Sequence, residues 1–152
     1  MLKFDILTLF PEMIEGFISS SILKRACEQN LIEINVINFR KYSGNKHSTV
    51  DDYAYGGGAG MLIRVDPIVR ALKDIEGYNE HKTWNIITSP TGKTWNQQEA
   101  IKASKEHDHI VIVCGHYEGI DERAIELCVD RQISIGDYVL TGGEIPAMAN
   151  RW

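Results

Sequence analysis

Short apolar segments rich in β-branched residues alternate along this chain with segments of helical periodicity. Such alternation is typical of parallel strands joined by crossover helices. The predicted strands are Lys3–Leu9, Ile32–Phe39, Trp84–Thr88, His109–Cys114 and Gln132–Ile135. The predicted helices begin near Pro11, Asp66-Pro67, Trp95 and Asp121. In the first helix, apolar side chains recur at the spacing of a core-facing stripe, namely Phe10, Met13, Ile14, Phe17 and Ile18. The pattern predicts an α/β fold with a mostly parallel sheet flanked by helices.

The length and composition suit one domain in a reducing compartment. The chain has 152 residues, of which 43% are hydrophobic and 24% charged, as expected for a single packed core. No apolar run reaches the roughly 20 residues of a membrane-spanning helix, and the first residues lack the pattern of a signal peptide. Cys27, Cys114 and Cys128 lack the spacing of metal or redox sites, so we expect free thiols in the cytoplasm. The net charge of -5 argues against a surface that is basic throughout, but it allows a local basic strip.

Three of the predicted strands run into loops that contain glycine. The loops follow Thr88, Cys114 and Ile135. In open α/β sheets, ligands bind beyond the carboxyl ends of the strands, and glycine lets main-chain groups approach a ligand closely. Three such loops favour one shared small-molecule pocket. Tyr117 and Tyr138 would offer it flat aromatic surfaces suited to an adenine or a nucleobase.

Residues 40–61 form a long polar and then glycine-rich segment without periodicity. The run Gly56-Gly57-Gly58-Ala59-Gly60 fits neither a phosphate-binding loop nor a dinucleotide fingerprint, because no G-K-[ST] follows and no G-x-G-x-x-G frame fits. A loop that closes over a substrate and an ordinary surface turn both remain open. The preceding basic residues, between Arg40 and His47, could contact phosphates or form a solvated turn.

Candidate residues for acid–base chemistry are few. Glu118 lies between two glycines of the second loop, where it could bind a ligand, help to hold a cation or influence a proton transfer. Asp121 suits a helix N-cap instead. His107 and His109 flank Asp108, and we interpret them as a solvated turn rather than as metal ligands. No H-E-x-x-H or G-x-S-x-G motif supports metal-dependent or serine-dependent hydrolysis.

Five segments together resemble one protein family. They are LTLFPEM (7–13), NFRKY (38–42), VDDYAYGGGAGM (50–61), CGHYEGIDER (114–123) and ISIGDYVLTGGEIPAM (133–148). In order and spacing they are similar to the bacterial tRNA (guanine-N1)-methyltransferases, which modify the guanosine just 3′ of the anticodon, position 37. The resemblance implies a SPOUT-type fold whose C-terminal part forms a deep trefoil knot. It also implies a homodimer, S-adenosyl-L-methionine as cofactor, tRNA as substrate and magnesium as a second cofactor.

The resemblance also implies roles for particular residues. Cofactor contacts would come from Ser89, Pro90, Gly115, Tyr117, Gly119, Ile135, Gly136, Asp137, Tyr138, Val139, Leu140, Gly142, Gly143 and Pro146. The RNA would face Arg40, Lys41, Lys46, His47, Tyr55, Gly56, Gly57 and Gly58. Glu118 matches a family glutamate implicated in activity, and no residue is assigned as a metal ligand.

Residues 149–152 depart from the family pattern. We expect one SPOUT domain over residues 1–152 without the family's C-terminal helical tRNA-binding domain or the aspartate usually proposed as general base. The chain alone should then bind cofactor weakly and methylate tRNA poorly. One alternative is a non-catalytic cofactor-binding or dimerisation module that keeps the same fold. Another is a nucleotide-binding oxidoreductase, which the absence of a fitting glycine fingerprint disfavours.

Overall fold

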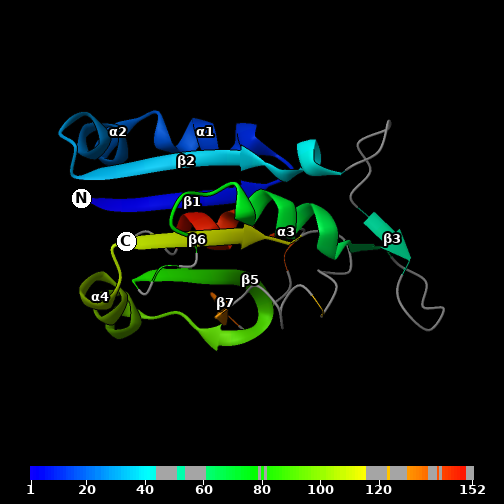
Figure 1. The fold of residues 1–152 in the computed structure, drawn as a ribbon. Coiled ribbons are helices and arrows are strands. Elements are labelled where there is room, and N and C mark those ends of the chain that lie inside the picture. The colour runs from blue at the N-terminus through cyan, green and yellow to red at the C-terminus, as the bar shows by residue number, and fades with distance from the viewer. Residues whose placement is uncertain are drawn as a thin grey trace.

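The sheet of the protein has five strands, all parallel, in the order β2-β1-β6-β5-β7 (Figure 1). The computed structural model describes residues 1–43, 51–53, 61–78, 80, 82–115, 123, 130–136, 140 and 142–149. The strands of this sheet are β1 (Leu2–Thr8), β2 (Ile32–Asn38), β5 (Thr83–Thr94), β6 (His109–Cys114) and β7 (Arg131–Ser134). A separate antiparallel pair consists of β3 (Asp51–Tyr53) and β4 (Met61–Ile63). The predicted α/β fold with a mostly parallel sheet is confirmed.

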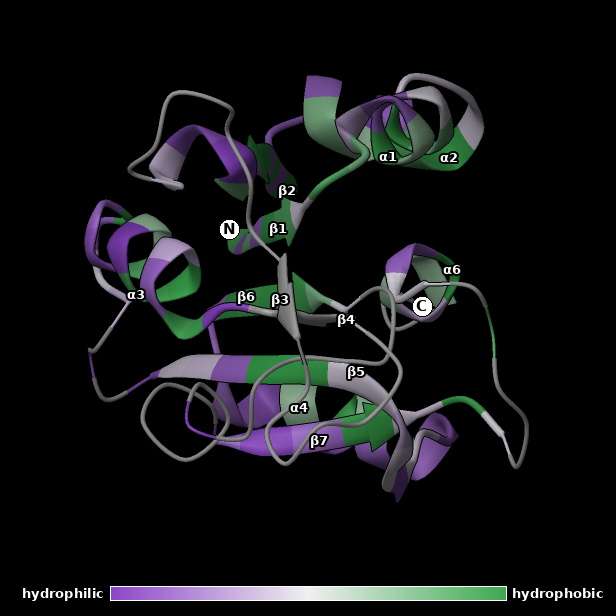
Figure 2. Ribbon diagram, turned by 90° about the vertical axis from the view of Figure 1, so that its right-hand side faces the viewer, coloured by the Kyte–Doolittle hydropathy of each residue, from purple (hydrophilic) through white to green (hydrophobic). Residues whose placement is uncertain are grey.

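Helices cover both faces of this sheet. They are α1 (Pro11–Ile18), α2 (Ser21–Glu28), the 3-10 helix η1 (Phe39–Tyr42), α3 (Val65–Lys73), α4 (Gln97–Glu106) and α6 (Glu144–Ala149). Figure 2 shows α3 on one side of the sheet and α1, α2 and α6 on the other. Pro11 occupies the start of α1, as predicted. Ile14 of the predicted stripe is buried, but Met13 is 43% exposed, so its assignment to the core was wrong.

Two hydrophobic clusters lie on opposite faces of the sheet. Val111 and Val113 of β6 belong to the cluster that includes Ile68 and Leu72 of α3. Ile110 and Ile112 alternate with them and belong to the second cluster, which includes Ile14 of α1, Ala103 of α4 and Ala147 of α6. Because successive side chains of a strand point to opposite faces, a strand covered on both sides must be apolar throughout. This explains why all six residues of β6 are buried.

Strand β5 continues beyond the predicted end at Thr88. Thr88 and Lys93 both pair with Ile133 of β7, so residues 89–92 form an irregularity in the register. Gly92 is required there, because a Cβ atom would lie 2.5 Å from the main-chain carbon of Gln132. The segment expected to be a simple loop therefore stays attached to β7.

Helix α4 starts at a capped N-terminus. The Asn96 side chain accepts a hydrogen bond from the main-chain N–H of Glu99 over 2.9 Å. Since an N-cap asparagine satisfies a donor that has no partner within the helix, replacing Asn96 with alanine should lower the free energy of unfolding by about 1 kcal/mol. Urea denaturation measures this, and Asn96→Asp, which keeps a capping oxygen, should stay close to the wild type.

The amino ends of the strands enclose a polar network that the sequence did not reveal. The His109 Nε2 atom lies 2.5 Å from Asp5 Oδ2, and His109 Nδ1 lies 3.3 Å from Thr83 Oγ1. Asp5, Thr83 and His109 are all buried. The interpretation of His107 and His109 as a solvated turn was therefore wrong for His109, which lies in the sheet between its two neighbours, β1 and β5.

Other expectations depend on residues outside the described ranges. The predicted knot would involve the C-terminal part of the chain, where residues 116–122, 124–129, 137–139 and 141 are not described, so the knot stays a prediction. The helix predicted at Asp121 also lies there, as does Cys128. Cys114 is buried and Cys27 is half-buried, both as free thiols. Within the described ranges, no helix is long and apolar enough to span a membrane.

Candidate functional site

The carboxyl end of β6 and Thr88, the last residue of β5 that pairs with β6, meet the turn that precedes α6. The main-chain N–H of Gly143 donates to the carbonyl oxygen of Gly115 over 2.8 Å. The Thr88 hydroxyl donates to the carbonyl oxygen of Gly143 over 3.2 Å. The beginnings of the first two glycine-bearing loops and the end of the third are therefore joined by hydrogen bonds at one end of the sheet.

Packing at this junction leaves no room for a side chain on Gly143. A Cβ atom there would overlap with Thr88 Oγ1 and would lie 2.8 Å from the Gly115 nitrogen and 3.0 Å from the Cys114 Cα. The glycine is needed for this close approach of its main chain to that of Cys114 and Gly115 and to the Thr88 hydroxyl. Main-chain polar groups of Gly115 and Gly143 and the Thr88 hydroxyl are thus concentrated within a few ångströms of each other.

The Ser134 side chain organises the turn after β7. The Ser134 hydroxyl donates to the carbonyl oxygen of Gly136 over 2.8 Å, and the Gly136 N–H lies 3.2 Å from the same hydroxyl oxygen. Ser134 is buried. In the extension of β5, the Ser89 hydroxyl oxygen lies 3.0 Å from that of Thr91. The turn after β7 and this extension of β5 lie toward the same end of the sheet, because β5 and β7 run parallel.

The predicted cofactor residues are distributed as follows. Gly115 and Gly143 are in direct contact, and Gly142 precedes Gly143 in the chain. Pro146 is buried in α6, while Leu140 is 36% exposed. The remaining described members follow Thr88 or β7, namely Ser89, Pro90, Ile135 and Gly136. The rest lie outside the described residues, namely Tyr117, Gly119, Asp137, Tyr138 and Val139, together with Glu118.

Two buried polar residues join β1 to the same junction. The Thr8 hydroxyl donates to Glu144 Oε1 over 2.6 Å. Thr8 is the last residue of β1, and Glu144 is the first residue of α6. The two positions are 136 residues apart in the chain, so no local pattern could have paired them. A glutamate at the start of a helix is favoured by the helix dipole, but burial of this one is unusual for its residue type.

The predicted RNA-facing segment is described only in part. Arg40 and Lys41 lie in η1, and Lys41 is exposed. Tyr42, the last residue of η1, donates its hydroxyl to Asp74 Oδ2 over 2.8 Å, and this hydrogen bond to a carboxylate raises the pKa of Tyr42. Arg70 of α3 donates to the carbonyl oxygen of Tyr42. These contacts fix η1 against α3, while Lys46, His47, Tyr55, Gly56, Gly57 and Gly58 lie outside the described residues.

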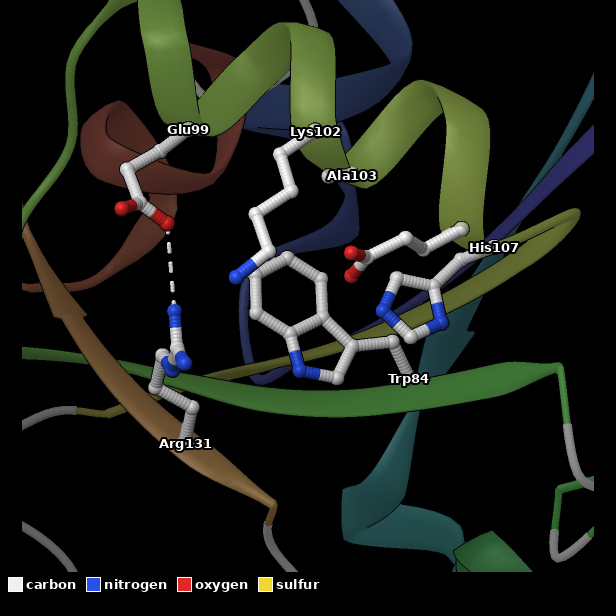
Figure 3. A pocket seen from close by; sticks show the side chains of 7 residues that line it. Trp84, Glu99, Lys102, Ala103, His107 and Arg131 are labelled. Carbon is white, nitrogen blue, oxygen red and sulfur yellow. Dashed lines mark hydrogen bonds and ion pairs between the residues drawn. The ribbon is translucent and has the colours of Figure 1, made fainter.

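A small pocket lies at the opposite end of the sheet (Figure 3). The His107 ring stacks on Trp84 with a centroid distance of 5.0 Å and an interplanar angle of 3°. Arg131 lies over the same indole and also pairs with Glu99, and Lys93 and Arg131 keep the pKa of Glu99 low. The volume of about 40 Å³ suits water molecules rather than a nucleoside. This pocket is therefore unsuited to the adenosine part of a cofactor.

Comparison with known proteins identifies the family. The profile of the family described as tRNA (Guanine-1)-methyltransferase TrmD matches residues 2–150 of the chain. The chain belongs to this family. Over 147 residues it is 52% identical to the tRNA (guanine-N(1)-)-methyltransferase of Bacillus pumilus and 50% identical to that of Bacillus subtilis. Each alignment covers 97% of this chain and 60% of the relative, so the chain spans about three fifths of the length of these tRNA (guanine-1)-methyltransferases.

The fold agrees with a solved member of the family. The crystal structure of tRNA (m1G37) methyltransferase from Aquifex aeolicus superposes with a TM-score of 0.86 at 38% sequence identity. The match covers 98% of this chain and 66% of the other. The resemblance drawn from the five sequence segments is confirmed at the level of family and fold. Among the residues that the structure describes, no group of three or more His, Cys, Asp or Glu side chains could hold a metal ion.

Proposed function

We propose that this chain transfers a methyl group from S-adenosyl-L-methionine to N1 of the guanosine at position 37 of tRNA. The observation that supports it best is the junction of Thr88, Gly115 and Gly143, because this is where the ends of parallel strands would present main-chain groups to a ligand. Family membership supplies the reaction class.

The residues at this junction suit a cofactor of this kind. Main-chain N–H and C=O groups can hydrogen-bond the amino-acid, ribose and adenine parts of S-adenosyl-L-methionine without a bulky side chain in the way. The bound cofactor supplies an electrophilic methyl carbon. The protein has to hold the guanine N1 in line with it, and orientation of this kind accounts for a large part of such rate enhancements.

Proton removal is the second requirement. N1 of guanine has a proton that must leave during or before attack, and a general base must lie within hydrogen-bonding reach. Glu118 is our candidate for a role in this chemistry, directly or with a bound magnesium ion. A target base in a tRNA loop can be turned out and recognised on its Watson–Crick edge, and Arg40 and Lys41 are our candidates for contacts with phosphates.

We also propose the domain organisation, the compartment and the oligomeric state in which the reaction takes place. Residues 1–152 would act as one SPOUT domain in the cytoplasm, with the two active sites of a homodimer at the subunit interface. Exposed apolar side chains lie close to the proposed pocket in the sequence, since Leu140 and Ile145 flank Gly142 and Gly143. Multi-angle light scattering should give the mass of two chains, and a monomer at all accessible concentrations would contradict this part.

The cofactor and the reaction are tested by two measurements. In calorimetric titrations, S-adenosylmethionine and S-adenosylhomocysteine should bind and NADH should not. With tritiated S-adenosylmethionine, label should pass slowly to an unmodified tRNA transcript with G37 and not to the same transcript with A37. Binding of NADH alone would contradict the proposal. Cofactor binding without any transfer at excess enzyme would support a non-catalytic module instead.

A further inference from the structure

Three consecutive hydrogen-bonding groups fasten the turn before α6 to three adjacent strands. The Gly143 N–H bonds to Gly115, which follows β6. The Gly143 carbonyl oxygen accepts from Thr88 of β5. The Glu144 side chain accepts from Thr8 of β1. Because β1, β6 and β5 are neighbours in the sheet, the turn lies across the ends of β1 and β6 and the last residue of β5 that pairs with β6.

We propose that Glu144 is a positioning residue of the cofactor pocket and that Thr8 acts with it. Neither side chain needs to touch the cofactor. Their hydrogen bond instead holds the main chain of Gly142 and Gly143 at the distance from Gly115 that binding requires. This inference rests on the proposed function, since it concerns the same pocket.

The Thr8 hydroxyl accepts one hydrogen bond and donates another, so it can hold Glu144 while it is itself held by the main chain. The Thr8 oxygen accepts the N–H of Phe10 over 2.9 Å, so its own proton is available for Glu144 Oε1 over 2.6 Å. The hydroxyl therefore connects the start of α1 to the start of α6. Thr8 is 0% and Glu144 1% exposed, and water cannot easily replace either partner. Removal of the Thr8 hydroxyl would leave a buried carboxylate oxygen with one hydrogen bond fewer, which is unfavourable away from water.

The adjacent glycine makes the pocket sensitive to such displacement. Glu144 directly follows Gly143 in the chain, so movement of Glu144 shifts the Gly143 main chain, which has no room to adjust against Thr88, Cys114 and Gly115. A pocket lined by main-chain groups cannot compensate by a change of rotamer. Loss of the Thr8–Glu144 hydrogen bond should therefore weaken cofactor binding through loss of preorganisation.

The first arm of the test needs no ligand. Native-state hydrogen exchange of the Gly143 amide should be faster in Thr8→Val and Glu144→Ala than in the wild type, at a temperature well below the unfolding transition of each variant. Thr8→Ser, which keeps the hydroxyl, should retain the wild-type protection. Unchanged protection of Gly143 in both disruptive variants would overturn the proposal, whether or not the chain binds S-adenosylmethionine.

The second arm measures the Kd for S-adenosylhomocysteine by calorimetry. We expect Thr8→Val and Glu144→Ala each to raise the Kd at least tenfold, and Thr8→Ser to stay within about twofold. If Thr8→Val and Glu144→Ala act through the same hydrogen bond, the Kd of the double variant should be little higher than that of either single variant. Asn96→Ala is the matched control, because it destabilises α4 away from the junction and should leave the Kd unchanged.

The outcomes separate this inference from the proposed function. If the wild type fails to bind, the proposed function falls, and the exchange of Gly143 still decides the role of Glu144. If the wild type binds and Thr8→Val binds equally well, the positioning role is wrong and the proposed function stands. If Thr8→Ser or Asn96→Ala weakens binding as much as Thr8→Val does, the effect is general destabilisation and the inference is also wrong.

Discussion

Replacing Gly143 with alanine should weaken S-adenosylmethionine binding about tenfold to a hundredfold. The new methyl group would overlap with Thr88 Oγ1 and come within 2.8 Å of the Gly115 nitrogen. Overpacking of this kind costs about 1–3 kcal/mol, and each 1.4 kcal/mol is about tenfold in an equilibrium constant. Two of the three obstructing groups are main-chain atoms, so a change of side-chain rotamer cannot relieve the strain. Calorimetric titration of the folded variant measures the loss.

Gly16 provides the control for this substitution. It lies inside α1, and a Cβ atom there would have nothing within 4 Å. Alanine is a better helix former than glycine, so Gly16→Ala should raise the free energy of unfolding by about 0.5–1 kcal/mol and leave cofactor affinity unchanged. Equal affinities for the two variants would mean that the Gly143 junction is not part of the binding pocket.

Replacing Asp5 with alanine should cost about 3–5 kcal/mol of folding free energy, because one partner of a buried pair is removed. The Asp5 side chain is 4% exposed and that of His109 is 9% exposed. The Thr83 hydroxyl donates to the Gly77 carbonyl oxygen over 2.5 Å, so its oxygen is left to accept from His109 Nδ1. Without Asp5, the Nε2 side of the ring would face the core with no carboxylate. Urea unfolding measures the loss.

The exposed ion pair of Lys24 and Glu28 is the control for the substitution of Asp5. Lys24 and Glu28 lie 4.0 Å apart, with side chains that are 58% and 62% exposed. Glu28→Ala should change the free energy of unfolding by less than about 0.5 kcal/mol.

A double-mutant cycle tests the buried pair itself. The double variant Asp5→Ala/His109→Ala should lose much less folding free energy than the sum of the two single variants. Strict additivity would show that the two side chains do not interact as the distances indicate.

The strands were predictable because burial on both faces leaves a strong apolar signal. The prediction for His109–Cys114 agrees with β6, and that for Ile32–Phe39 differs from β2 by one residue. The β5 extension was missed because Pro90 and Gly92 normally end a strand, whereas here they lie in a register irregularity against β7. The order of the strands has no local signal at all.

The site was predictable only where its residues lie in short motifs. Gly115 directly follows a predicted strand, Gly143 belongs to the glycine-bearing loop after Ile135, and both lie in segments that resemble the family. Thr8 and Glu144 could not be paired, since their contact depends on the sheet order. His109 was misread because its polar neighbours, His107 and Asp108, look like a solvated turn. Its burial comes from the strands on either side.

The most direct test is chemical-shift mapping of S-adenosylmethionine on the isotopically labelled chain, with ligand up to millimolar concentration. We expect the amide signals of Gly115, Gly142 and Gly143 to move together with one Kd, while those of His107 and Arg131 at the other end of the sheet stay in place. Shifts confined to the end with His107 and Arg131, or glycine signals that do not move while the ligand binds, would contradict a single pocket at the strand ends.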